Sequence, residues 1–154
     1  MLTRVKRSSR QKIKAAFAIV ASRYNDRYVG AMLRAAQQEL RRAGAKVSVF
    51  RVPGAYEIPV VTSRLARTGS PPFAAIVCLG VILRGETTHA AHIGEAVSEA
   101  LMRIQLEYEI PVIHEVLFLE NEQQARARCL GRKHNRGTEA AQTALAMARI
   151  MASL

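Results

Sequence analysis

Several features that many proteins have are missing from this chain. It has only two cysteines, Cys78 and Cys129, too few for a disulfide framework, so a reducing, cytoplasmic setting is expected. No apolar run approaches the roughly 18 residues of a membrane-spanning helix, so no membrane association is expected. The histidines lack the spacing of metal ligands, which predicts no metal site. They are His89, His92, His114 and His134.

Acidic residues are also scarce. Lys and Arg number 23 against 12 Asp and Glu, and the net charge of +11 would attract nucleic acid, an acidic partner or a phosphorylated substrate. The aromatic content of 5% offers few stacking platforms and no nucleic-acid-binding motif appears, so a polyanion binder is kept only as the alternative. Residues 1–14 contain no acidic residue, which predicts a flexible basic arm before a single domain over 15–154.

The start of the chain can be interpreted in two ways. A basic leader followed by the apolar residues 15–21 is typical of an export signal. The apolar part has only the minimum length for such a signal, and Arg23 follows it at once. The same residues suit a first buried strand, and that interpretation is favoured.

Strand and helix patterns alternate along the rest of the chain, without an internal repeat or a linker. The predicted strands are 15–21, 46–50 (at a sheet edge), 73–78 and 111–117. The predicted helices run over about 26–43, 57–67, 90–109, 121–130 and 140–152. This alternation predicts an α/β fold with a parallel sheet and right-handed crossovers.

The stretch 79–89 joins the third predicted strand to the longest predicted helix. Thr87 or Thr88 can cap that helix, whose first N–H groups attract anions, and His89 lies where it could transfer protons. Glu86 and Thr87 stand where a P-loop requires Lys and Ser or Thr, which excludes a P-loop. The stretch therefore predicts an anion cradle beside a proton shuttle, with an ordinary loop and a surface histidine as the alternative.

The loops after the four predicted strands should meet at one rim of the sheet, where ligands bind in such folds. These loops are 22–26, 51–57, 80–89 and 118–121. Three of the four contain residues that suit ligand binding. Their convergence predicts an active site at this rim for a small anionic ligand.

Individual side chains at the rim keep two interpretations each. Tyr24 could stack on a flat ring or pack against apolar neighbours. Glu57 could act on a ligand or only favour the dipole of the helix that it opens. Arg128, in the basic cluster 126–136, could hold a phosphate or be solvated.

Taken together, the loops resemble the lumazine synthase family of riboflavin biosynthesis. The resemblance covers roughly residues 13–150, and its motifs occur in the family's order and spacing. The matching motifs are Ser22-Arg23-Tyr24-Asn25, Val52-Pro53-Gly54-Ala55-Tyr56-Glu57-Ile58-Pro59, Arg84-Gly85-Glu86-Thr87-Thr88-His89, and Asn135-Arg136-Gly137 with Glu139-Ala140-Ala141.

The resemblance implies a three-layer α/β/α sandwich with a four-stranded parallel, flavodoxin-like sheet. It implies a transferase that condenses 5-amino-6-ribitylaminouracil with 3,4-dihydroxy-2-butanone 4-phosphate, releasing phosphate and water, with no metal and no redox cofactor. It also implies a homopentamer, or a multiple of it, with sites shared between subunits. A member that binds the pyrimidine or a flavin without turnover is the alternative.

Site residues follow from the resemblance position by position. Substrate contacts are implied for Tyr24, Asn25, Ala55, Tyr56, Glu57, Val81, Ile82, Leu83 and His114. Phosphate contacts are implied for Glu86, Thr87 and Arg128. His89 matches the proton shuttle, and both Arg128 and His114 would be supplied by the neighbouring subunit.

The chain departs from the family at a few positions. His114 stands where the family has mostly Phe, Glu115 where Gly is common, and Arg136 where Lys is frequent. Phe118-Leu119 replaces a Thr pair. These departures concern the ring contacts from the neighbouring subunit and leave the phosphate site and the stretch 79–89 intact.

Overall fold

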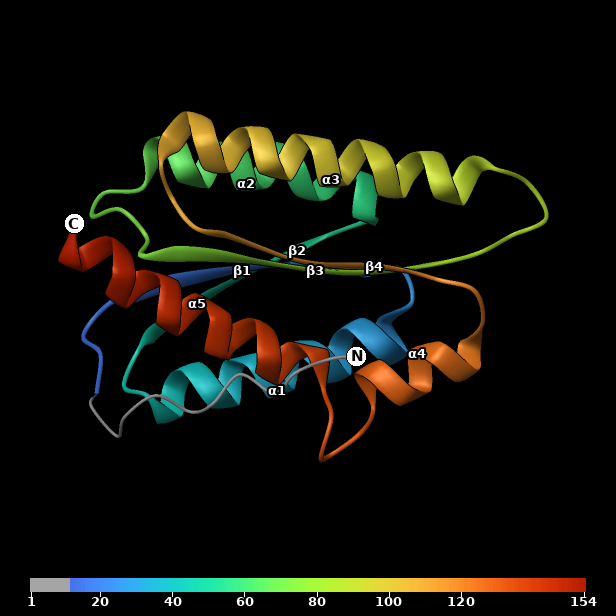
Figure 1. Cartoon of the computed structure of the whole chain (residues 1–154), viewed down its shortest axis with the longest axis horizontal. Helices are drawn as coiled ribbons and strands as arrows, with labels where there is room; N and C mark the ends of the chain where they lie inside the picture. Colours follow the sequence, from blue (N-terminus) through green and yellow to red (C-terminus); the bar gives the residue numbers. More distant parts are fainter. Residues whose placement is uncertain (1–11) are drawn as a thin grey trace.

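The computed structural model describes residues 12–154, so residues 1–11 of the predicted arm lie outside the described part. The elements are β1 Ala16–Ser22, α1 Asp26–Arg42, β2 Lys46–Val52, the short 3-10 helix η1 Ala55–Glu57, α2 Ile58–Thr68, β3 Ala75–Leu83, α3 His89–Tyr108, β4 Val112–Leu119, α4 Glu122–Cys129 and α5 Arg136–Ser153. The parallel sheet has the strand order β2-β1-β3-β4. Helices α2 and α3 cover one face, and α1, α4 and α5 cover the other (Figure 1). The predicted three-layer α/β/α sandwich is confirmed.

The two central strands are apolar because both of their faces are covered. In β1, Phe17 and Ile19 pack toward α1 and α5, whereas Ala18 and Val20 pack toward α2 and α3. Cys78 in β3 is fully buried, as predicted for a core residue. Strand β2 lies at the edge, which confirms its prediction from the alternating pattern 46–50.

The first described residues are tied to the end of α1. The Ile13 amide donates a hydrogen bond of 2.8 Å to the Ala43 carbonyl, and the Ile13 side chain packs against the core. Gly44 follows with a φ of 89°, a conformation that strongly favours glycine, and it ends the helix where the sequence predicts.

Strand β3 is longer than predicted. The sequence predicts a loop from residue 80 onward, but residues 80–83 continue the strand and pair with residues 116–119 of β4. Gly80 lets the strand pass its neighbours closely, because a Cβ there would lie 3.1 Å from Val116 Cγ1 and 3.3 Å from Ile58 Cδ1. The loop is therefore only residues 84–88. Residues 80–83 before it belong to β3 and have the extended backbone of a strand.

Helix α5 begins earlier than predicted, at Arg136 rather than at Ala140. The Asn135 side chain caps it, since its Oδ1 accepts a 2.8 Å hydrogen bond from the Gly137 amide while its Nδ2 donates to Cys129 O. A Cβ on Gly137 would lie 2.0 Å from the Met32 carbonyl oxygen, so glycine is what lets α5 approach α1. The Asn-Arg-Gly motif therefore caps and packs the last helix.

Candidate active site

A pocket of about 900 Å³ opens at the carboxyl ends of β1 and β3. Nine of the predicted site residues line it: Tyr24, Asn25, Ala55, Tyr56, Glu57, Val81, Ile82, Leu83 and His89. They come from the β1–α1 loop, η1, the end of β3 and the first turn of α3. Three of the four loops predicted to form the rim therefore contribute to one pocket, and the fourth, 118–121, does not.

Part of the pocket lining was not among the predicted site residues. His92, Ile93 and Ala96 also line the pocket, together with Gly54 and Ala90. His92, Ile93 and Ala96 follow His89 by three, four and seven positions, the spacing of one helix face. Continuing that face along the predicted helix would have found them.

Asn25 joins the β1 loop to the end of β3. Its backbone is left-handed, with a φ of 58°, and its Nδ2 donates a 2.7 Å hydrogen bond to Val81 O. Asn25 occupies the N-cap position of α1, but its side chain makes no cap hydrogen bond. The contact holds Tyr24 at the rim, where its side chain is 74% exposed.

Glu57 closes the turn that begins η1. Its Oε2 accepts a 3.0 Å hydrogen bond from the Gly54 amide, so the carboxylate satisfies a free N–H at a helix start. Tyr56 beside it is 65% exposed and lines the same pocket as Tyr24. Two exposed tyrosines on one cavity wall suit a flat ligand ring that would stack on them.

The first turn of α3 forms the anion-favouring end of the pocket. Thr88 is the N-cap residue, but its side chain makes no cap hydrogen bond, and the His89 amide lies 3.4 Å from Thr87 Oγ1. Backbone N–H groups at such a helix start are free to bind an anion. Glu86 and Thr87 are exposed beside this turn and do not line the pocket.

Two predicted site residues lie away from this chain's own pocket. Arg128 is half-buried near the end of α4, in the layer on the other side of the sheet (Figure 1). His114 lies on the edge strand β4, where its ring faces α3 through Ser98. Neither residue lines the pocket, so this chain alone does not bring Arg128 and His114 together with the nine predicted residues that do.

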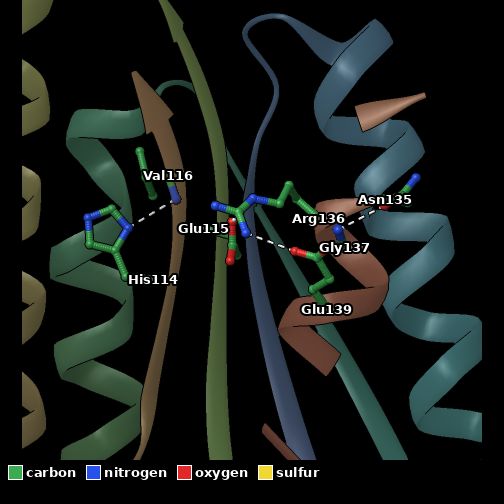
Figure 2. Close-up of polar contacts among 7 residues, drawn as sticks. All are labelled: His114, Glu115, Val116, Asn135, Arg136, Gly137 and Glu139. Carbon is green, nitrogen blue, oxygen red and sulfur yellow. Dashed lines mark hydrogen bonds and ion pairs between the residues drawn. The ribbon is translucent and has the colours of Figure 1, made fainter. Parts of the chain in front are cut away.

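A charged cluster under β4 was not predicted. Glu115 and His114 leave the strand on opposite sides, and Glu115 Oε2 lies 3.5 Å from Arg136 Nε (Figure 2). Arg136 Nη1 in turn lies 2.8 Å from Glu139 Oε2. Burial raises the pKa of Glu115 to about 7, against the attraction of the Arg136 charge. Glu115 and Arg136, which both differ from the residues common in the family, therefore contact each other. This contact arises only in the folded chain, because the two residues lie on different elements.

Replacing Glu115 with glutamine should stabilise the protein at high pH. The pKa of Glu115 rises from 4.5 to about 7 on folding, so the stability that its proton confers is complete below pH 4.5 and is lost toward pH 7. Glu115→Gln should therefore match the parent near pH 5 and exceed it near pH 8 by at most about 3 kcal/mol. Urea unfolding at several pH values and fixed protein concentration measures the difference.

The control for this experiment is Glu99→Gln. Glu99 is 75% exposed and pairs only at the surface with Arg103, at 2.9 Å. Its replacement should shift stability by a small amount that hardly changes with pH. A Glu115→Gln difference that also stays constant across the pH range would contradict the buried carboxyl described above.

Among the described residues there is neither a cluster of metal-ligating side chains nor a helix that could span a membrane, and the two thiols are poor nucleophiles. Within 12–154, no group of three or more His, Cys, Asp or Glu side chains could hold a metal ion. In the same range, no helix has the length and apolar character needed to cross a membrane. Burial raises the pKa of the Cys78 thiol to about 12 and that of the Cys129 thiol to about 11, so neither suits a nucleophile.

Comparisons with known proteins identify the family of this chain. Residues 14–152 match the family model described as 6,7-dimethyl-8-ribityllumazine synthase. The chain is 41% identical over 143 residues to the protein of that name from Stenotrophomonas maltophilia strain R551-3, covering 91% of each chain. It is 40% identical over 140 residues to that from Xanthomonas oryzae pv. oryzae strain PXO99A, covering 89% of this chain and 90% of the relative. The chain therefore belongs to the 6,7-dimethyl-8-ribityllumazine synthase family.

Proposed function

We propose that this chain condenses 5-amino-6-ribitylaminouracil with 3,4-dihydroxy-2-butanone 4-phosphate to form 6,7-dimethyl-8-ribityllumazine in riboflavin biosynthesis. The observation that carries the proposal is the single pocket that gathers nine of the residues predicted from the family resemblance. Membership of the family supports the same reaction.

The pyrimidine occupies the wall formed by the β1 loop, η1 and the end of β3. Tyr24 stacks on its ring, and the segment from Ala55 to Glu57 contacts the ring and its ribityl chain. The backbone of Val81, Ile82 and Leu83 forms a strand end that can exchange hydrogen bonds with the polar ring atoms. The Val81 carbonyl already accepts from Asn25, which keeps this edge in place.

The butanone phosphate occupies the α3 end of the pocket. The backbone beside Glu86 and Thr87 and the free N–H groups of the first helical turn receive the phosphate. Arg128 from a neighbouring subunit grips it, because a guanidinium can contact two phosphate oxygens at once. His89 lines the same pocket, within reach of both proposed substrates.

The reaction then follows from this placement. The pyrimidine amine attacks the ketone carbonyl, water leaves as an imine forms, phosphate is eliminated, and the second amine closes the ring with loss of water. His89 transfers protons in these steps. Most of the acceleration comes from holding two substrates in register.

The active form is a homopentamer or a multiple of it, in the cytoplasm. Arg128 and His114 lie outside the pocket of their own chain, so a complete site requires a second copy. Large apolar side chains are also exposed on α3 and α5, and subunit contacts would cover them. They are Met102, Leu106, Ile150 and Met151.

Turnover of the two small substrates tests the proposal directly. Formation of the lumazine, followed by its absorbance and by phosphate release, is the expected result. Submicromolar, steeply salt-dependent RNA binding without turnover would favour the polyanion binder instead. Tight pyrimidine binding without turnover would point to a binding protein on the family's fold.

His89→Ala should slow the reaction without abolishing it. Loss of a general acid–base group lowers kcat by roughly a hundredfold or more, but the two substrates stay in register and water can move protons. His92→Ala is the matched control, since His92 lies one turn further along the same helix face and lines the same pocket. A kcat equal to that of the parent would refute the role of His89.

A further inference from the structure

Both ring nitrogens of His114 are used inside the chain. Nδ1 accepts a 3.1 Å hydrogen bond from the Val116 amide, drawn as a dashed line in Figure 2. Nε2 lies 2.7 Å from Ser98 Oγ on α3. The Ser98 hydroxyl is itself 2.8 Å from the Gly94 carbonyl, to which it donates. The ring is therefore held from β4 and from α3 at once.

These contacts allow only one neutral tautomer. Because Nδ1 accepts a backbone N–H, it carries no proton, and the proton of the neutral ring must lie on Nε2. Nε2–H then donates to Ser98 Oγ, whose own hydrogen goes to Gly94 O. A second ring proton would have to replace the bond from Val116, so the imidazolium does not fit this arrangement.

The surroundings of the ring also favour the uncharged form. On β3, the residue in register with His114 is Cys78, a buried thiol, and on α3 the facing group is the Ser98 hydroxyl. Burial lowers the pKa of His114, and the contact of the ring with its own backbone opposes this only in part. The nearest carboxylate along the strand, Glu115, lies on the opposite side of β4 (Figure 2).

We propose that Ser98 and the Val116 amide hold His114 as a neutral Nε2–H ring, which presents only an uncharged flat surface to the pyrimidine bound in the neighbouring subunit's pocket. The substrate-facing part rests on the proposed function, whereas the tautomer stands on this chain alone. Since both nitrogens are occupied, the ring offers no free donor or acceptor. His114 is thus a substitute for an aromatic side chain, and Ser98 is its positioning residue.

Nitrogen NMR of the histidine rings in the assembled protein tests the tautomer. Two-bond ¹⁵N–¹H spectra distinguish an unprotonated Nδ1 from a protonated one, and the His114→Phe spectrum identifies the His114 signals. We expect an unprotonated Nδ1 and a protonated Nε2 near neutral pH. In Ser98→Ala the ring loses its contact with α3 and can rotate away from the Val116 amide, so a mixture of tautomers is expected. A protonated Nδ1 or a charged ring in the parent at neutral pH would overturn the inference.

Steady-state kinetics test the surface that the ring presents. His114→Phe should keep the KM for the pyrimidine within about threefold of the parent, whereas His114→Ala should raise it roughly three- to tenfold, the range of one aromatic contact. Ser98→Ala should raise the same KM with little change in kcat, and Ser98→Thr, which keeps a hydroxyl, should restore it. Ser153→Ala is the control, because Ser153 also donates to a helix carbonyl, that of Ile150, but lies at the end of α5 rather than on α3.

The outcomes separate the two halves of the inference. If Ser98→Ala shows a mixture of His114 tautomers but an unchanged KM for the pyrimidine, the proposed contact of the ring with the pyrimidine is refuted. A parent protein with the expected tautomer but no turnover would contradict the proposed function and that surface together, while supporting the tautomer. Poor activity of His114→Phe with intact pentamers would show that the ring nitrogens contact the substrate, which also overturns the inference.

Discussion

Replacing Arg128 with alanine is expected to leave almost no turnover. The guanidinium is proposed to orient the butanone phosphate and to stabilise the departing phosphate, so its loss affects both binding and the elimination step. We expect kcat/KM to fall by roughly a thousandfold, as when a well-placed charged donor is removed from an active site. Arg128→Lys should recover only part of this loss, because an ammonium cannot make the planar two-oxygen contact.

Arg126→Ala is the matched control for Arg128→Ala. Arg126 lies on the same helix and is exposed, with a surface ion pair to Glu122 at 3.4 Å. Its removal should change kcat/KM by less than about threefold, because exposed pairs contribute little. Equal losses in the two variants would show that the basic helix acts only through its overall charge.

A mixing experiment shows whether the site is shared. Glu57→Ala should impair the pocket wall, whereas Arg128→Ala removes the residue proposed to come from the neighbouring subunit. In rings refolded from equal amounts of both variants, roughly a quarter of the interfaces would combine an intact Glu57 with an intact Arg128. Activity of the mixture should then far exceed the mean activity of the two variants assayed separately. Native mass spectrometry verifies that the rings contain five subunits of both kinds.

If verified mixed rings show only the mean activity of the two separate variants, the shared site is ruled out. No chain in the mixture carries both intact residues, so a site within one subunit cannot recover. Light scattering that shows a monomer at micromolar concentration would contradict the pentamer by itself.

Gly137→Ala should be the most destabilising single methyl addition in the described chain. The added Cβ would lie 2.0 Å from the Met32 carbonyl oxygen and 2.7 Å from Met32 Cα, and both atoms belong to the backbone of α1. Helices α1 and α5 would have to separate, at a cost of at least about 3 kcal/mol. This outweighs the gain of up to about 1 kcal/mol that alanine brings to a helix.

Gly94→Ala is the control, measured with Gly137→Ala by urea unfolding at one protein concentration. Gly94 also lies in a helix, but a Cβ there would be 3.6 Å from Phe118 Cβ, an ordinary contact. It should leave stability unchanged or slightly higher. If Gly137→Ala yields no folded protein at all, Gly137→Ser is measured as well. Failure of Gly137→Ser to fold, together with a folded Gly94→Ala, would then support the close helix contact at Gly137. A folded Gly137→Ala of parental stability would refute it.

Local patterns were sufficient to predict an α/β fold with a parallel sheet, whereas the three layers were implied by the family resemblance. Unbroken apolar runs predicted the central strands, because strands covered on both faces have no polar side to show. The alternation in 46–50 predicted an edge strand, and β2 lies at the edge. The order of strands and helices predicted the rim at which the nine pocket residues meet, because the carboxyl ends of parallel strands share one edge.

Element ends were less well predicted, because they depend on neighbours distant in sequence. Residues 80–83 remain in β3 because β4 pairs with them and because Gly80 fits against Ile58 and Val116. Asn25 stands at the N-cap position of α1, but its side-chain amide donates to the Val81 carbonyl, 56 residues away. Neither partner is visible from the local pattern.

The sequence by itself determined the fold class, the rim of the pocket and the family, since these depend on short-range periodicity and on motifs with specific spacing. Only the tertiary structure decided what the unusual residues on β4 do. It placed Glu115 against Arg136 under the sheet, and His114 between Val116 and Ser98 on the other side. The physical reason is that a buried charge or a ring tautomer is set by atoms within about 4 Å, and those atoms come from elements far apart in the chain.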